Sequence, residues 1–124
     1  MNETRSIYLL AAHPDWRASR VNRRLLDVAT TLAAQGVPLD IQDLYGNYPD
    51  YAIDVAVEQA RLEAASLVVL MHPIQWYSMP ALQKLWLDEV LTFGWAYGAR
   101  SGAPGGAEGH ALQGKDLWLV ASTG

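Results

Sequence analysis

The sequence predicts an α/β fold built on a parallel β-sheet. Short apolar runs alternate with segments of helical periodicity, an alternation typical of βαβ units. The runs at 7–12, 66–71 and 117–121 are apolar at nearly every position, as in parallel strands that are covered on both faces. The chain has 124 residues, which is the length of one domain, and it shows no internal repeat.

The first strand and helix are predicted within residues 7–35. The apolar run 7–12 is followed by His13 and Pro14 and predicts a buried strand. Residues 19–35 carry apolar side chains at helical spacing, with Ser19 as the expected N-cap and a glycine just after the last turn. The apolar positions of this helix are Val21, Leu25, Val28 and Leu32.

A more polar strand and a second helix follow. Residues 37–44 mix apolar with acidic side chains, which predicts a half-exposed edge strand. Residues 45–51 form a tyrosine-rich connector that contains glycine, asparagine and proline. Helical spacing of Val55, Ala56, Gln59 and Leu62 then predicts a helix over 54–64.

The last part of the chain predicts two buried strands around a third helix. The strand 66–71 is ended by His72 and Pro73, and the helix 80–93 starts with Pro80, which the first turn tolerates. The run 117–121 predicts a last buried strand. An apolar strand is unfavourable as a bare edge, so we expect either a partner that covers it or a longer protein, and we favour the longer protein.

Composition excludes several classes of protein. Half of the residues are hydrophobic and twelve are aromatic, which excludes a disordered chain. The absence of cysteine excludes a disulfide-rich module and a cysteine zinc site, and the three histidines are too dispersed to predict a metal site. The net charge of −4 argues against nucleic-acid binding through a basic surface. Without a long apolar segment or a signal peptide, the chain is expected to be cytoplasmic.

Polar side chains follow three of the predicted strands, where open α/β sheets bind ligands. After the first strand come His13 and the segment 17–24, which holds four of the nine basic residues. A helix start, a serine hydroxyl and arginines suit a phosphate, but Ser19 as a simple cap with a solvated arginine face is about equally favoured.

The other two strand ends carry an aromatic corner and a hydroxyl-rich turn. Gln75, Trp76 and Tyr77 lie in a proline-braced loop, 72–80, that suits a flat heteroaromatic ligand. Alternatively, the two aromatic side chains are core or subunit contacts. The turn 122–124 is a weak signal by itself. The glycine-rich segment 98–114 lacks a nucleotide-binding fingerprint and predicts a surface loop with a solvated His110.

Several segments together resemble one family. They are His13-Pro14 with Ser19-x-Val21-Asn22, Asp43-Leu44-Tyr45 with Tyr48-Pro49-Asp50, the segment 72–80, Leu82 with Lys84-Leu85-Trp86 and Glu89-Val90, and Gly94-Trp95-Ala96-Tyr97-Gly98. The chain resembles the flavodoxin-fold NAD(P)H:quinone oxidoreductases over nearly its whole length. Within them it is most similar to the Kef-type ancillary subunit of glutathione-gated potassium efflux systems.

The resemblance implies one flavodoxin-like FMN-binding domain over residues 1–124 that is incomplete at its C-terminal side. It implies a doubly wound sheet of strand order 2-1-3-4 that lacks the family's fifth strand.

The resemblance also assigns the FMN contacts. The phosphate and ribityl chain would be held by His13, Ser19, Arg20, Val21 and Asn22. The isoalloxazine ring would be edged by Ile74, Gln75, Trp76 and Tyr77. Its polar edge would meet Ser122, Thr123 and Gly124, where Ser122 stands in place of the usual threonine.

The implied function is two-electron, ping-pong hydride transfer from NAD(P)H to a quinone through FMN, with the second ligand bound at a homodimer interface. The aromatic side chains Trp95 and Tyr97 would then come from the partner. The alternative is a regulatory subunit that docks on a membrane potassium efflux protein, with or without turnover, and so lies at the inner face of the membrane. A one-electron flavodoxin is disfavoured, because flavodoxins are usually more acidic and have a short phosphate loop rich in serine and threonine.

Overall fold

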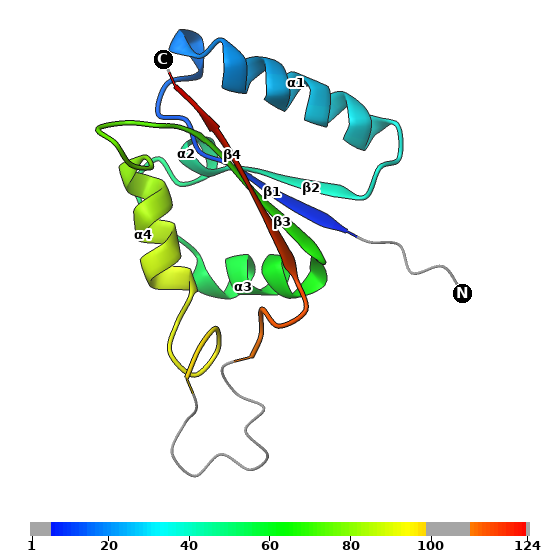
Figure 1. The fold of residues 1–124 in the computed structure, drawn as a ribbon, viewed down its shortest axis with the longest axis vertical. Coiled ribbons are helices and arrows are strands. Elements are labelled where there is room, and N and C mark those ends of the chain that lie inside the picture. Colours follow the sequence, from blue (N-terminus) through cyan, green and yellow to red (C-terminus); the bar gives the residue numbers. More distant parts are fainter. Residues whose placement is uncertain (1–5, 99–109, 124) are drawn as a thin grey trace.

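A computed structural model describes residues 6–98 and 110–123, and it shows a parallel four-stranded sheet between helices (Figure 1). The strand order is β2-β1-β3-β4, which confirms the predicted fold class and order. The strands are β1 (Ile7–Ala11), β2 (Leu39–Asp43), β3 (Leu67–Pro73) and β4 (Asp116–Ser122). The helices are the 3-10 turn η1 (Trp16–Ala18), α1 (Val21–Ala34), α2 (Leu44–Asn47), α3 (Val55–Ala64) and α4 (Ala81–Val90).

The two faces of the sheet carry two apolar clusters. Successive side chains of a strand point to opposite faces, so Tyr8 and Leu10 pack towards α3 and α4, whereas Leu9 and Ala11 pack towards α1. The larger cluster includes Leu62 of α3 and Trp86 of α4. This arrangement explains why β1 and most of β3, up to Met71, are apolar.

Several predicted boundaries differ from the structure. β3 continues through His72 and Pro73, because they pair in register with Ala121 and Ser122 of β4. The helix predicted over 80–93 ends at Val90. The connector predicted at 45–51 contains the short helix α2, which begins at Leu44, a residue predicted to belong to the strand.

The start of α1 also differs from the prediction. The N-cap position is Arg20, which makes no side-chain capping bond, so the prediction that Ser19 is the N-cap is wrong by one position. The Ser19 hydroxyl still accepts a hydrogen bond from the backbone N–H of Arg23, at 2.9 Å. Ser19 therefore satisfies one free N–H of the first turn from outside the helix.

The prediction that the last strand is buried is wrong. β4 is an edge strand, and its side chains Leu117, Trp118 and Leu119 are 64%, 61% and 64% exposed. Within the described residues, no element covers the outer edge of β4. The apolar run predicted two covered faces, but the sequence does not show whether the covering elements are present. Most of the segment 98–114 lies outside the described residues, and His110 is exposed.

Candidate functional site

The ends of β1, β3 and β4 meet in one pocket beside the start of α1. Because the strands are parallel, their carboxyl ends lie at the same edge of the sheet. The pocket has a volume of about 280 Å³, near the lower limit for ligand pockets. It is lined by His13, Ala18, Ser19, Arg20, Val21, Asn22, Pro73, Ile74, Gln75, Ser122 and Thr123.

This pocket brings together most of the predicted cofactor-binding residues. Trp76 and Tyr77 do not line it, and Gly124 lies outside the described residues. The sequence analysis assigned no ligand contact to Ala18 and Pro73, which also line the pocket next to predicted residues.

Asn22 forms the most buried polar wall of the pocket. It is the second residue of α1 and only 2% exposed. Its amide nitrogen donates a hydrogen bond of 2.7 Å to the Ser122 hydroxyl, which joins α1 to the end of β4. The amide oxygen Oδ1 is buried and has no hydrogen-bond partner among the described residues. A buried acceptor without a partner is unfavourable, so this atom suits a ligand that donates a hydrogen bond.

His13 lines the pocket, and one of its ring nitrogens is held by a hydrogen bond within its own loop. Nδ1 accepts a hydrogen bond from the backbone N–H of Asp15, at 3.0 Å, which leaves Nε2 as the nitrogen that can donate. Burial lowers the pKa of His13, and the Asp15 carboxylate opposes this effect. The neutral imidazole is therefore favoured before an anion binds.

Only one of the four clustered arginines lines the pocket. That residue is Arg20. Arg17 lies 3.6 Å from the Asp15 carboxylate and Arg23 lies 3.6 Å from Asp27, all with exposed side chains. Arg24 lines a separate shallow hollow on α1. The two alternatives for the arginines, a phosphate site and a solvated face, therefore each hold for part of the segment. Arg20 belongs to the pocket, and the other three form a solvated face.

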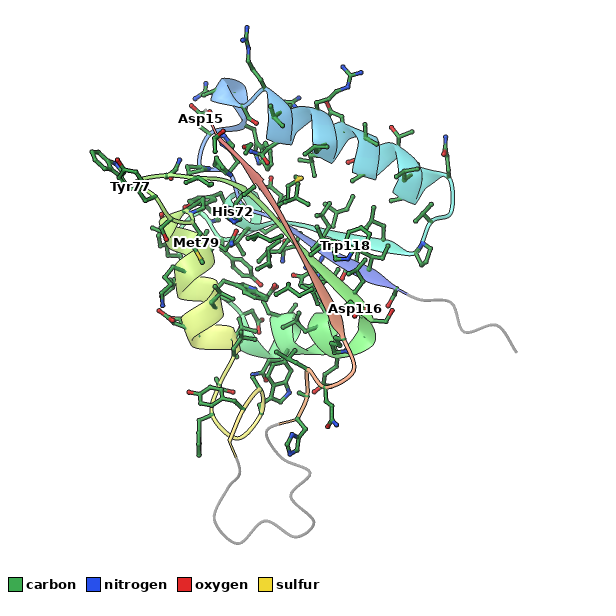
Figure 2. All side chains as sticks on the ribbon, viewed as in Figure 1. Asp15, His72, Tyr77, Met79, Asp116 and Trp118 are labelled. Atoms are coloured by element: carbon green, nitrogen blue, oxygen red, sulfur yellow. The ribbon has the colours of Figure 1, made fainter. Side chains whose placement is uncertain are left out.

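Trp76 and Tyr77 form the tip of a tight turn next to the pocket. The backbones of Gln75 and Ser78 exchange hydrogen bonds of 2.7 and 3.0 Å across this tip. Trp76 and Tyr77 have φ angles of 49° and 65° and are 94% and 98% exposed. Figure 2 shows Tyr77 directed away from the sheet. The alternative that they are core aromatics is therefore wrong. The base of the turn is fixed to β4, because Ile74 N–H donates to the Ser122 carbonyl at 2.8 Å.

The sequence analysis missed a buried carboxylate on the sheet face that α3 and α4 cover. Glu58 of α3 is fully buried and accepts hydrogen bonds from Gln42 Nε2 at 2.9 Å, Tyr48 Oη at 2.8 Å and Trp86 Nε1 at 2.9 Å, and also from Tyr8 Oη. Burial and this carboxylate raise the pKa of Tyr48 to about 12, and that of Tyr8 further. The available signal was that position 58 shares a helix face with Leu62.

Two kinds of feature are absent from residues 6–98 and 110–123. In this part of the chain, no helix combines the length and apolar character needed to cross a membrane. The same residues contain no group of three acidic or histidine side chains placed to hold a metal ion.

Comparison with known proteins identifies the family. Residues 5–124 match the family described as having a flavodoxin-like fold. Among curated relatives, the glutathione-regulated potassium-efflux system ancillary protein KefF of Klebsiella aerogenes is 48% identical over 118 residues, which cover 95% of this chain and 60% of that protein. The chain thus spans about three fifths of the length of the curated relatives it matches.

Solved structures give the same fold under different names. General stress protein 14 of Treponema denticola, in complex with FMN, is 38% identical with a TM-score of 0.80, covering 97% of this chain and 62% of that one. An NADPH-quinone reductase from P. pentosaceus is 28% identical with a TM-score of 0.74 over 96% of this chain and 60% of that one. A thermophilic tryptophan halogenase from Streptomycin violaceusniger is 40% identical with a TM-score of 0.80, covering 94% of this chain and 61% of that one. The match over nearly its whole length shows that this chain belongs to the flavodoxin-like fold family.

Proposed function

We propose that this chain is the FMN-binding part of an NAD(P)H:quinone oxidoreductase. The observation that carries the proposal is the pocket at three strand ends, with the buried, unpartnered Oδ1 of Asn22 in its wall. Support comes from a relative of the same fold solved with FMN and from another named an NADPH-quinone reductase. When bound, FMN would supply the two-electron carrier that takes hydride from NAD(P)H and delivers it to a quinone.

The residues of the pocket fit the chemical groups of FMN. The first turn of α1 has free N–H groups, and with Ser19, Val21 and Arg20 it suits the phosphate. Asn22 Oδ1 can accept a hydrogen bond from a ribityl hydroxyl, and His13 Nε2 can donate one to the phosphate or the ribityl chain.

The ring end of FMN is assigned to the other two strand ends. Ile74 and Gln75 line the pocket there, together with Ser122 and Thr123. Trp76 and Tyr77 stand beside it and would edge the ring from outside the pocket. We assign Gly124 to the same turn by its position after Thr123.

We further propose that residues 1–124 are one part of a single, longer flavodoxin-like domain that acts as a homodimer. The exposed apolar strand β4 supports the longer domain, as does the share of the relatives that this chain spans. In the dimer, the partner would cover the side on which NAD(P)H and the quinone alternate.

Flavin binding is the first test. The purified chain should quench the fluorescence of added FMN and retain a flavin absorbance band after gel filtration. Loaded protein should then oxidise NADH or NADPH with a quinone and show parallel lines in double-reciprocal plots, as a ping-pong reaction requires. Colourless protein that does not quench FMN would contradict the proposal.

A second candidate function is regulation of a potassium efflux protein. It is favoured by the 48% identical relative, which is named as an ancillary protein of such a system. His13→Ala separates the two functions, because His13 lines the pocket. The variant should lose reductase activity, and it should still activate potassium efflux if docking alone is sufficient. Loss of both activities together would tie regulation to turnover.

A further inference from the structure

The loop between β1 and α1 forms one wall of the pocket, yet most of it is exposed. Pro14, Asp15, Arg17 and Ala18 all face solvent. The loop's own hydrogen bonds are local: Ala18 N–H donates to the Asp15 carbonyl, and Arg17 N–H donates to the Asp15 carboxylate, both at 3.1 Å. Such local bonds shape the turn but do not fix it relative to the sheet.

Trp16 is the anchor of this loop. Its ring packs against the apolar cluster under α1, and its Nε1–H donates to Asp43 Oδ1 at 3.0 Å. In the described part of the chain, this is the hydrogen bond that joins residues 14–18 to the sheet. Asp43 is the last residue of β2 and pairs in register with Ala11, the last residue of β1. The anchor point therefore lies one strand away from the base of the loop.

Asp43 is itself held in place. Its Oδ1 also accepts a hydrogen bond from the backbone N–H of Gly46, at 3.2 Å, as the N-cap of α2. A Cβ atom at position 46 would collide with the Asp43 carboxylate, so glycine leaves room for the carboxylate over this turn. The acceptor is thus fixed before Trp16 binds it.

Trp16 contacts two residues that line the pocket, His13 and Ser19. Its ring lies against the His13 imidazole, with centroids 5.3 Å apart and planes at 31°. Its backbone carbonyl accepts a hydrogen bond of 3.1 Å from the N–H of Ser19. His13 and Ser19 both line the pocket, whereas Trp16 and Asp43 do not.

We propose that Asp43 is a positioning residue, which acts through Trp16 to hold His13 and Ser19 in place around an anionic ligand. The inference rests on the function proposed above for the choice of ligand, an organic phosphate. Its physical basis is preorganisation: a wall fixed beforehand lowers the ordering cost of binding.

The variants are chosen to remove one contact at a time. Trp16→Phe keeps an aromatic side chain at this position but loses the donor to Asp43, so the ring is no longer fixed against His13. Asp43→Ala loses the acceptor, whereas Asp43→Asn keeps an oxygen that can accept from both Trp16 and Gly46. Val90→Ala, in the cluster on the other face of the sheet, is the control for general loss of stability.

The first measurement is FMN affinity, by fluorescence quenching. Trp16→Phe and Asp43→Ala should each weaken binding about tenfold, and the double variant should be no weaker than either single variant. Asp43→Asn should stay within about twofold of the original chain, which is the rescue expected for a neutral acceptor. Val90→Ala should lower the melting temperature without changing the affinity.

The second measurement needs no flavin. The pKa of His13, followed by NMR without ligand, should rise in Trp16→Phe towards the ordinary value of about 6.5, because the ring that buries it is released. The charged groups near His13, Asp15 in its loop and Arg20 in the pocket, stay the same in this variant. Asp43→Asn isolates the effect of the Asp43 charge.

The two measurements separate this inference from the proposed function. If the original chain does not bind FMN, the proposed function fails, and the pKa of His13 still decides whether Asp43 and Trp16 position it. The positioning role is overturned if FMN binds but Trp16→Phe and Asp43→Ala leave its affinity unchanged. It is also overturned if the pKa of His13 in Trp16→Phe equals that of the original chain.

Discussion

At the residue scale, Asn22 shows how one side chain can serve both the fold and a ligand. Its amide nitrogen binds the Ser122 hydroxyl, a residue one hundred positions away in the sequence. Its amide oxygen remains buried and unpartnered. The sequence placed Asn22 in the candidate site only through the resemblance, because nothing in local spacing shows that β4 returns to meet α1.

Replacement of this amide by an apolar side chain of similar size should affect binding more than folding. In Asn22→Leu, the lost hydrogen bond is offset by removal of the unpartnered acceptor, so the free energy of unfolding should change by less than about 1 kcal/mol. FMN affinity should fall about tenfold or more, because no acceptor remains for a ligand hydroxyl. Urea unfolding and FMN fluorescence titration measure the two effects. Thr31→Ala, on the exposed part of the same helix, is the control.

At the scale of elements, hydrophobic patterning predicted the type of nearly every helix and strand, because burial repeats with the period of each element. It predicted ends less well. β3 continues through Pro73 because β4 pairs with it, and α2 forms because the Asp43 side chain caps it. The Asp43 cap is a local signal that the interpretation of residues 45–51 as a connector missed. The pairing of β3 with β4 joins distant segments and is absent from any local pattern. For the same reason Glu58 was missed, since its four hydrogen-bond donors come from four different segments.

The Glu58 cluster should be a main source of stability. Glu58→Ala leaves buried donors of Tyr8, Gln42 and Trp86 without their acceptor, so the free energy of unfolding should fall by about 4 kcal/mol. Glu58→Gln keeps one acceptor oxygen and should lose about half as much. Glu63→Gln is the control: this glutamate of the same helix is exposed, and among the described residues its carboxylate accepts a hydrogen bond from Trp95 alone. Equal losses for Glu58→Ala and Glu63→Gln would contradict the assigned role.

The turn at Trp76 and Tyr77 has backbone strain that its sequence does not relieve. Two consecutive positive φ angles match the hairpin turn that favours Asn-Gly, and bulky aromatics are unfavourable there. Trp76→Asn with Tyr77→Gly should therefore stabilise the chain by about 1 kcal/mol or more, seen as a higher melting temperature.

The same double variant should weaken FMN binding if the aromatic pair edges the ring, as proposed above. Tyr51→Asn provides the control, because Tyr51 also has a positive φ, 63°, and lies outside the pocket. Tyr51→Asn should relieve backbone strain at position 51 without changing the affinity for FMN. Unchanged FMN affinity in the double variant would remove Trp76 and Tyr77 from the proposed site.

At the scale of the whole molecule, the sheet has two unlike edges. β2, at one edge, alternates apolar and polar residues, and its polar side chains are exposed, as Asp40 is, or hydrogen-bonded in the interior, as Gln42 is to Glu58. β4, at the other edge, is apolar and exposed. Val21, Val28 and Leu32 of α1 are exposed apolar side chains as well. An apolar edge strand with free backbone groups is a site for association. The proposal of a longer domain accounts for this surface, because additional chain would cover it.

The isolated chain should therefore associate through β4. Sedimentation velocity over a range of concentrations should show dimers or larger species, and Leu117→Lys with Leu119→Lys should shift the chain to monomer, because charge on an edge strand opposes pairing. Glu89→Lys changes the net charge by the same two units at an exposed site on α4, so it separates position from overall charge. Since neither leucine lines the pocket, the lysine variant should bind FMN as the original chain does. A chain that is monomeric at all concentrations without these substitutions would show that β4 is tolerated as a free edge, and it would remove the exposed strand as support for a longer domain.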